Sequence, residues 1–124
     1  MRKLITLTAL MFFVSSVQAV ELHSRTTPLG QVLTDEHGMT LYTFDKDKNG
    51  TSACYDDCAT RWPPVYVNAN VKLTPPFSST ARRDGKLQLR WNNQPLYLWF
   101  KDKAPGETSG DMVNKVWHVV LINP

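Results

Sequence analysis

The sequence predicts a mainly β domain, a small antiparallel β-sandwich or barrel-like fold built from two pseudo-symmetric repeats, each with a short helical turn. The first observation is a repeated string: LYTFDKDK at residues 41–48 returns in register as LYLWFKDK at residues 96–103. The second is that Trp62 and Trp117 are related by the same offset of 55 positions. The third is that the hydrophobic segments are short, aromatic and β-branched, and are separated by turn residues, as is typical of strands.

The N-terminus has the features of an export signal. Arg2 and Lys3 form a basic start, an apolar run covers residues 4–14, and small residues precede a cut between Ala19 and Val20. The apolar run is shorter than the roughly 20 residues that span a bilayer. We therefore expect residues 1–19 to be a cleaved signal peptide. The mature chain, residues 20–124, is expected to be a single β domain with one core and no transmembrane segment.

Processing at this position changes the charge balance. The full chain carries 14 Lys and Arg against 11 Asp and Glu, a net charge of +3. Loss of Arg2 and Lys3 lowers the basic count to 12 and the net charge to +1. A nearly neutral mature chain has no general electrostatic attraction for nucleic acids. We therefore expect no nucleic-acid partner.

The elements follow one another in the same order in both halves. In the first half, the pattern predicts an arm or edge strand at 20–27 and strands at 30–36 and 39–44. A loop at 45–52, two helical turns at 53–61 capped by Ser52, and a strand at 65–67 follow. A connector over residues 68–83 leads to the second half. That half predicts strands at 86–91, 95–100 and 116–122, a hairpin turn at 92–93, a loop at 101–110 and a helical turn at 111–115.

These elements place the repeats at about residues 28–67 and 83–122. Each repeat has only two or three strands, and so small a sheet cannot bury both of its faces. We expect the two repeats to pack face to face around a shared core, and neither to be stable alone.

The repeated residues resemble a known family, the secreted-repeat domains described as predicted lipoproteins with a Tyr-x-(Phe/Trp/Tyr)-x-x-Asp motif. The motif occurs here at residues 42–47 and again at 97–102, and the resemblance extends over about residues 28–122. It implies a bacterial, exported protein of unknown function, with no catalytic residues to carry over. The chain has no cysteine directly after the signal, which departs from the lipoprotein pattern and favours a soluble periplasmic or secreted protein rather than a lipid-anchored one.

The motif side chains have two interpretations. Their rings fill the core between the repeats, and the carboxylates order the loops that follow. Alternatively, the rings form an aromatic ligand slot with the carboxylates at its rim. The candidate residues are Tyr42, Phe44, Asp47, Tyr97, Trp99 and Asp102.

The loop after the first motif partly fits a calcium-binding template. Oxygen-bearing side chains at alternate positions, with a glycine at the bend, suit a hard cation. Against this, a strand rather than a helix enters the loop, two lysines lie within it, and the last acidic position is Asp rather than Glu. The candidate ligands are Asp45, Asp47, Asn49 and Asp56.

Cys54 and Cys58 suggest a structural disulfide in an oxidising compartment. In a regular helix their Cβ atoms would be about 5–6 Å apart, whereas a relaxed disulfide needs about 3.8 Å. A bridge therefore requires a distorted turn. A thiol-redox role stays open, although the Cys-x-x-Cys spacing of thioredoxin-like centres is missing.

Other metal sites have weaker signals. Zinc would need two further ligands from dispersed histidines, His23, His37 and His118. Copper could use soft ligands, and the candidates are His23, His37, Met39 and Met112.

The chain shows none of the common hydrolase or transferase motifs, so we expect no enzyme activity. The sequence thus favours a non-enzymatic envelope binding or accessory module, without a cofactor, that recognises an envelope partner or small ligand. The alternative is a calcium- or copper-binding or thiol-redox protein that uses the loop at residues 45–58.

Overall fold

The structure is a computed structural model that describes residues 8–9 and 18–123. Most of the predicted signal peptide, residues 1–7 and 10–17, lies outside the described part. Within the described part, no helix is long and apolar enough to cross a membrane.

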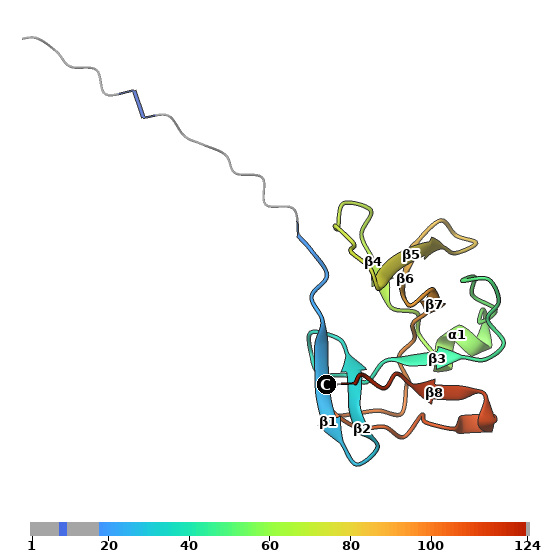
Figure 1. Ribbon diagram of the computed structural model, residues 1–124. Helices are drawn as coiled ribbons and strands as arrows, with labels where there is room; N and C mark the ends of the chain where they lie inside the picture. Colours follow the sequence, from blue (N-terminus) through green and yellow to red (C-terminus); the bar gives the residue numbers. More distant parts are fainter. Residues whose placement is uncertain (1–7, 10–17, 124) are drawn as a thin grey trace, which may run out of the picture.

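The fold consists of three antiparallel sheets (Figure 1). Strands β1 (His23–Thr27) and β2 (Gly30–Thr34) form a hairpin, and β3 (Tyr42–Phe44) pairs with β8 (Trp117–Val119). In the third sheet, β6 (Leu87–Trp91) lies between β4 (Tyr66–Val67) and β5 (Phe77–Ala81) and also pairs with β7 (Gln94–Pro95). The only helical elements in residues 18–123 are α1 (Asp57–Arg61) and the 3₁₀ turn η1 (Val113–Lys115). The predicted mainly β fold of two repeats is therefore confirmed, although these sheets remain open and form no closed barrel.

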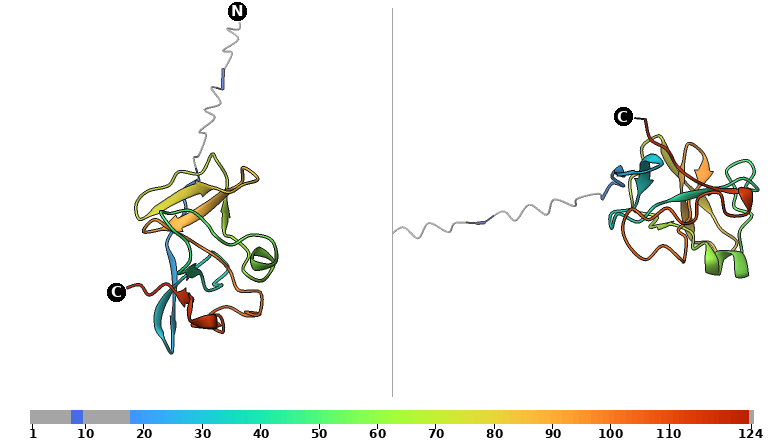
Figure 2. Two further views of the ribbon diagram at one scale, coloured as in Figure 1. Left: turned by 90° about the vertical axis from the view of Figure 1, so that its right-hand side faces the viewer. Right: turned by 90° about the horizontal axis from the view of Figure 1, so that it is seen from below.

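Strands are exchanged between the two halves of the chain. From the first half, β3 pairs with β8 of the second, and β4 pairs with β6 of the second. The C-terminal segment returns along β2, where the Leu33 amide donates to Val120 and the Ile122 amide donates to Gln31. Figure 2 shows this C-terminal segment beside the β1–β2 hairpin. Because each half supplies strands that complete the sheets of the other, the halves are interlocked rather than merely packed together.

The segment predicted as a connector, residues 68–83, contains a strand. β5 pairs with β6 from Phe77↔Trp91 to Ala81↔Leu87. The Ser-Ser-Thr run at residues 78–80 is typical of a loop, but hairpin pairing with the apolar β6 overrides that local preference. At the repeat offset, β5 corresponds to β1, so each repeat begins with a hairpin strand, and only the second of the two was missed in the sequence.

The helical segment is shorter than predicted. It begins at Asp57 rather than Ala53, and its N-cap residue is Asp56, with φ of 54° and no side-chain capping bond. Ser52 is therefore not the cap. Its hydroxyl instead meets Tyr97 Oη at 2.7 Å and accepts a hydrogen bond from Arg82. The same hydroxyl also accepts from the Cys54 amide at 3.1 Å, so Ser52 orders the turn before α1 and bonds to Tyr97 and Arg82 instead of capping the helix.

The buried side chains form two clusters rather than the single core that we expected. One is aliphatic with a single buried phenylalanine, and we call it the aliphatic core: Leu33, Leu41, Phe77, Leu89, Leu96 and Val120. The other is the aromatic core: Tyr42, Cys54, Trp62, Tyr97, Trp99 and Trp117. Leu41 and Tyr42 are neighbours in the chain, yet they enter different cores because successive side chains of an extended segment point to opposite faces.

Candidate functional site

The two motif tyrosines lie at the centre of the aromatic core and face each other across an antiparallel bridge. The Tyr42 amide donates to the Tyr97 carbonyl at 2.9 Å, and the Tyr97 amide donates to the Tyr42 carbonyl at 3.0 Å. Both side chains are fully buried. This reciprocal pair relates the repeats by an approximate two-fold axis.

Each motif tyrosine donates its hydroxyl proton to the aspartate of the other repeat. Tyr42 Oη lies 2.5 Å from Asp102 Oδ2, and Tyr97 Oη lies 2.6 Å from Asp47 Oδ2. The partners are 60 and 50 positions apart in the chain. The Tyr and Asp of one motif therefore do not form a local pair, and the motif is completed only when both repeats are folded together.

The second carboxylate oxygen of each aspartate holds the loop that follows it. Asp47 Oδ1 accepts a hydrogen bond from the Ala53 amide at 2.7 Å. Asp102 Oδ1 accepts from the Ser109 amide at 3.1 Å and from the Ser109 hydroxyl at 2.6 Å. The loop-ordering role that the sequence suggested for these carboxylates is therefore present, and a bond to a buried tyrosine is added to it.

Burial perturbs the ionisation of this network. Burial, and next the hydrogen bond to an aspartate, raises the pKa of the Tyr42 and Tyr97 phenols well above their usual value. Burial also raises the pKa of Asp47 above its usual value, against the opposing effects of its hydrogen bonds and of Arg82. Both phenols are thus held in the protonated form, in which they donate hydrogen bonds.

The remaining rings form a symmetric stack. Its order is Phe44, Trp117, Trp62 and Trp99, with successive ring centroids 4.0, 3.8 and 4.0 Å apart. The two tyrosines meet the inner rings edge-on, Tyr42 at 5.4 Å from Trp62 and Tyr97 at 5.1 Å from Trp117. Phe44 and Trp99, which occupy equivalent motif positions, are the two end rings of the stack. The motif rings therefore pack mainly against one another, and Phe44 and Asp47 also line a small hollow of about 210 Å³ beside Asn92 and Asn93.

Two residues of this core were not singled out from the sequence. A Cβ on Gly110 would lie 2.9 Å from atoms of Trp62, Trp99 and Tyr42, so the rings pack directly against its backbone. The guanidinium of Arg82 is buried and donates to Ser52 Oγ, Gln88 Oε1 and the Cys54 carbonyl at 2.7–3.0 Å. Gly110 appeared in the sequence as an ordinary loop glycine, and Arg82 as part of the predicted connector at residues 68–83. No local pattern distinguished either of them.

The cysteines form the expected disulfide, Cys54–Cys58, with the Cα atoms 5.2 Å apart. Cys54 lies before α1 and Cys58 within it, so the bridge spans the start of the helix and not two positions of a regular one. Cys54 is fully buried in the aromatic core, whereas Cys58 is half-buried. The bridge therefore ties α1 to the aromatic core.

The calcium-loop candidates do not converge in the structure. Asp47 is committed to Tyr97 and Ala53, and Asp45 Oδ2 lies 2.8 Å from His118 Nε2 of the neighbouring strand. Asn49 and Asp56 are exposed residues with positive φ that shape their own turns. Within residues 8–9 and 18–123, no three His, Cys, Asp or Glu side chains are placed to share a metal ion.

The copper candidates lie on three different segments of the chain. His23 begins β1, whereas His37 and Met39 lie near the β2–β3 turn, where the His37 ring is 3.4 Å from the Glu36 carboxylate. Met112 is an exposed residue directly before η1.

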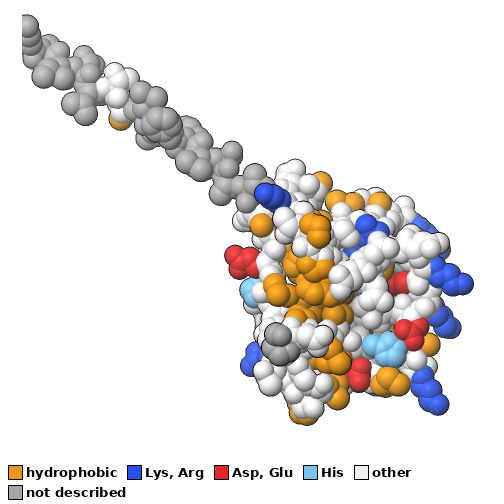
Figure 3. All heavy atoms as spheres, viewed as in Figure 1, with side chains coloured by type: hydrophobic (Ala, Val, Ile, Leu, Met, Phe, Trp, Pro, Cys, Tyr) orange, Lys and Arg blue, Asp and Glu red, His pale blue; other side chains and the backbone are white. Residues whose placement is uncertain are grey.

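The described chain also has an open groove of about 760 Å³. It lies between β1–β2 and the β4–β6–β5 sheet, and side chains of the aliphatic core form its floor. Figure 3 shows a band of hydrophobic side chains on this face, below the point where the N-terminal segment joins the body. None of the motif residues lines it.

Comparison with protein families matched the two halves of the chain separately. A family described as a secreted repeat of unknown function matches residues 23–66 and again residues 78–121. The matched segments begin at the hairpin strands β1 and β5, about five residues before the predicted starts at 28 and 83. Comparisons with curated proteins and with solved structures found no match. The chain therefore belongs to the secreted-repeat family, of which it carries two interlocked copies.

Proposed function

We propose that this protein is a soluble, non-enzymatic module of the bacterial periplasm that binds a partner or small ligand in the cell envelope. The observation that carries the proposal is the separation of the motif from the open groove. The polar atoms of the motif bond to one another inside the core, as in the Tyr42–Asp102 and Tyr97–Asp47 pairs, so the motif acts as a scaffold. The groove on the other core is left as the surface for recognition.

The residues also support a soluble rather than lipid-anchored form. Lipid attachment after signal cleavage requires a cysteine at the new N-terminus. The two cysteines of the chain are Cys54 and Cys58, and the disulfide engages both. The residue after the proposed cut is Val20.

The experiment is to express the full chain with its own leader in a Gram-negative host. The periplasm is released by osmotic shock, and intact mass measures the N-terminus and any lipid. We expect soluble protein that begins at Val20, is about 2 mass units lighter than its dithiol form and carries no acyl group. Protein that stays in the cytoplasm or sediments with membranes would contradict the proposal.

A thiol-redox function is the second candidate, favoured by the half-buried Cys58 on a short helix next to a fully buried Cys54. The two functions are separated by equilibrating the native protein with glutathione buffers and trapping free thiols. A structural bridge resists reduction, with a potential below about −300 mV, whereas oxidoreductase disulfides lie at about −120 to −270 mV. Metal analysis of the same preparation tests the calcium and copper alternatives directly.

A further inference from the structure

We propose that the groove between β1–β2 and β4–β6–β5 accepts an extended peptide segment of an envelope partner, with apolar side chains and a basic end. The peptide would pair with the backbone at Lys72 along the line that Gln18 and Ala19 follow in the unprocessed chain. This inference rests on the proposed export and on cleavage after Ala19.

The chain itself shows how an extended segment is held there. The Lys72 amide donates to the Gln18 carbonyl at 2.9 Å, and the Val20 amide donates to the Lys72 carbonyl at 3.4 Å. Ala19 and Lys72 form a parallel β-bridge. Residues 18–20 are thus bound as a short added strand, the arrangement by which many domains bind extended peptides.

Cleavage after Ala19 would remove two of the three residues of this strand. Gln18 and Ala19 leave, so the Lys72 amide loses its acceptor and the groove gains the space that the two residues filled. An unpaired strand-like edge beside an apolar surface is a ready site for another chain. Signal-peptide cleavage would therefore remove the chain's own residues 18–19 from this site and leave it open to a partner.

The side chains that line the groove define what would fit. The floor is apolar and consists of Leu41, Val65, Val67, Phe77 and Leu89. Val20 remains after cleavage and packs against the same cluster. A segment with small or branched apolar side chains would bury this surface, which is worth about 25 cal/mol per Å² of apolar area removed from water.

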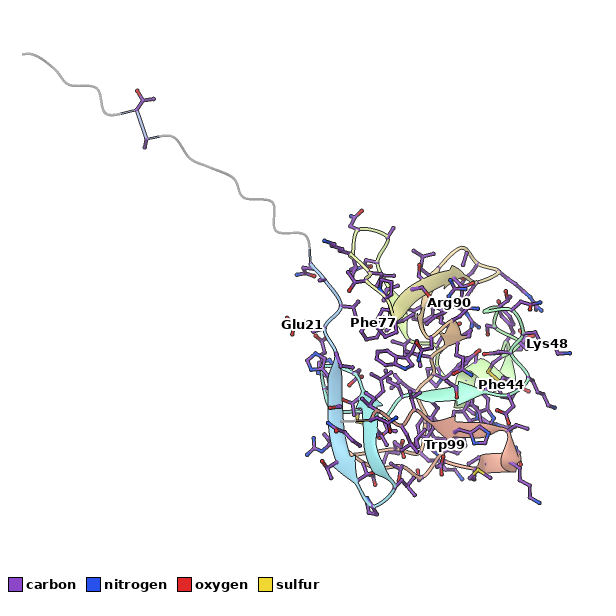
Figure 4. All side chains as sticks on the ribbon, in the orientation of Figure 1. Glu21, Phe44, Lys48, Phe77, Arg90 and Trp99 are labelled. Carbon is purple, nitrogen blue, oxygen red and sulfur yellow. A yellow bond between two sulfur atoms is a disulfide. The ribbon has the colours of Figure 1, made fainter. Side chains whose placement is uncertain are left out.

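The rim near β1–β2 is acidic and carries Glu21, Asp35 and Glu36. Figure 4 shows Glu21 just before β1, across from Phe77 at the start of β5. These carboxylates favour a cationic end on the peptide and oppose the phosphate of a lipid headgroup. An acyl chain would also leave the Lys72 amide without an acceptor. Both features favour a basic peptide over a lipid.

The test uses the processed protein purified from periplasm, after mass spectrometry has confirmed that it begins at Val20. The probe is a synthetic peptide with the sequence of residues 13–19, FVSSVQA, extended by two lysines at its C-terminus and capped at both ends. A matched peptide ends in two glutamates instead. Backbone amide shifts are followed by NMR during titration of each peptide. Monomeric dodecylphosphocholine serves as the lipid-like probe.

With the lysine peptide we expect saturable shifts of the Val71 and Lys72 amides and a dissociation constant in the millimolar range or below. The glutamate peptide should bind several-fold more weakly. Val71→Lys, which places a charge in the groove, should weaken binding at least about tenfold. Leu29→Lys is the matched control, because Leu29 is exposed, apolar and outside the groove. It should leave the affinity within about twofold of the unmodified protein, since isolated surface residues contribute little.

Each other outcome counts against the inference. If neither peptide gives saturable shifts, or if both bind equally well, the basic-peptide site is wrong. Binding of the detergent alone in the groove would identify an acyl-chain site instead. Should Val71→Lys not fold, Val71→Ala provides a milder groove variant, and unchanged affinity in it would overturn the assignment. A protein that does not begin at Val20 would contradict the proposed processing, an outcome separate from failure of the groove to bind.

Discussion

The indole rings of Trp62 and Trp117 stack face to face, with their centroids 3.8 Å apart and their planes at 2° to each other. They occupy equivalent positions in the two repeats, and both are buried, with 4% and 3% of their surface exposed. The approximate two-fold axis therefore passes between the two tryptophans, and each buried ring packs against the other.

This equivalence predicts equal costs for two separate substitutions. Trp62→Ala and Trp117→Ala should each lower the free energy of unfolding by about 3–5 kcal/mol, because each removes a buried ring and leaves a cavity beside its partner. The measurement is urea unfolding followed by circular dichroism. A large loss for one variant and none for the other would contradict the symmetric stack.

The exchanged Tyr–Asp bonds predict a cost for removing a single hydroxyl group. Tyr42→Phe leaves Asp102 Oδ2 without its phenol donor, and Asp102 has only 7% of its surface exposed. We expect the free energy of unfolding to fall by about 1–3 kcal/mol, the usual penalty for an unpaired buried polar group. Tyr66→Phe is the matched control, since Tyr66 is 50% exposed and should change stability little. Equal stability of both variants would show that the buried bond contributes nothing.

Gly110 predicts a steric effect in the aromatic core. Gly110→Ala would place a methyl group 2.9 Å from three rings, and we expect a loss of about 1–3 kcal/mol from overpacking. Trp99→Leu, which makes room beside that methyl group, should cost less in the Gly110→Ala background than in the unmodified protein. Thermal melts of the four proteins in this double-mutant cycle measure the coupling. Strictly additive losses would show that the two residues do not compete for space.

The raised pKa of Asp47 predicts the direction in which the stability of the protein changes with pH. Burial raises its pKa in the folded state above the usual value near 3.8, so the folded protein binds the proton more readily than the unfolded chain does. The resulting stabilisation is fully present below the unfolded pKa and is lost as the pH rises through the raised pKa. Relative to Asp47→Asn, which does not titrate, the unmodified protein should therefore gain stability as the pH falls into this window.

The measurement is urea unfolding of both proteins at matched pH values from neutral to acidic. Other carboxylates titrate in both proteins and cancel in the difference between them. A difference that stays constant with pH, or that changes in the opposite direction, would show that burial does not control this carboxyl group.

Local sequence was sufficient where a pattern determines structure over a few residues. The hairpin turn at Asn92 and Asn93 was predicted correctly, and both residues take the positive φ that such turns require. The strand segments around Tyr42 and Leu87 also formed where aromatic and β-branched residues indicated them. Local sequence failed at β5 and at the start of α1. Pairing with β6 made a strand of a polar run, and the helix begins at Asp57, beyond the reach of Ser52 as a cap.

The sequence by itself determined the repeat, its offset, the class of fold and the residues of the motif, because these are periodic properties of one chain. Only the tertiary structure decided that the strands are exchanged and that Tyr42 binds Asp102 rather than Asp47. It also separated Leu41 and Tyr42 into different cores and placed the open groove away from the motif. The physical reason is that a repeat shows which positions are equivalent, whereas contacts between the copies depend on how the two copies pack around their common axis.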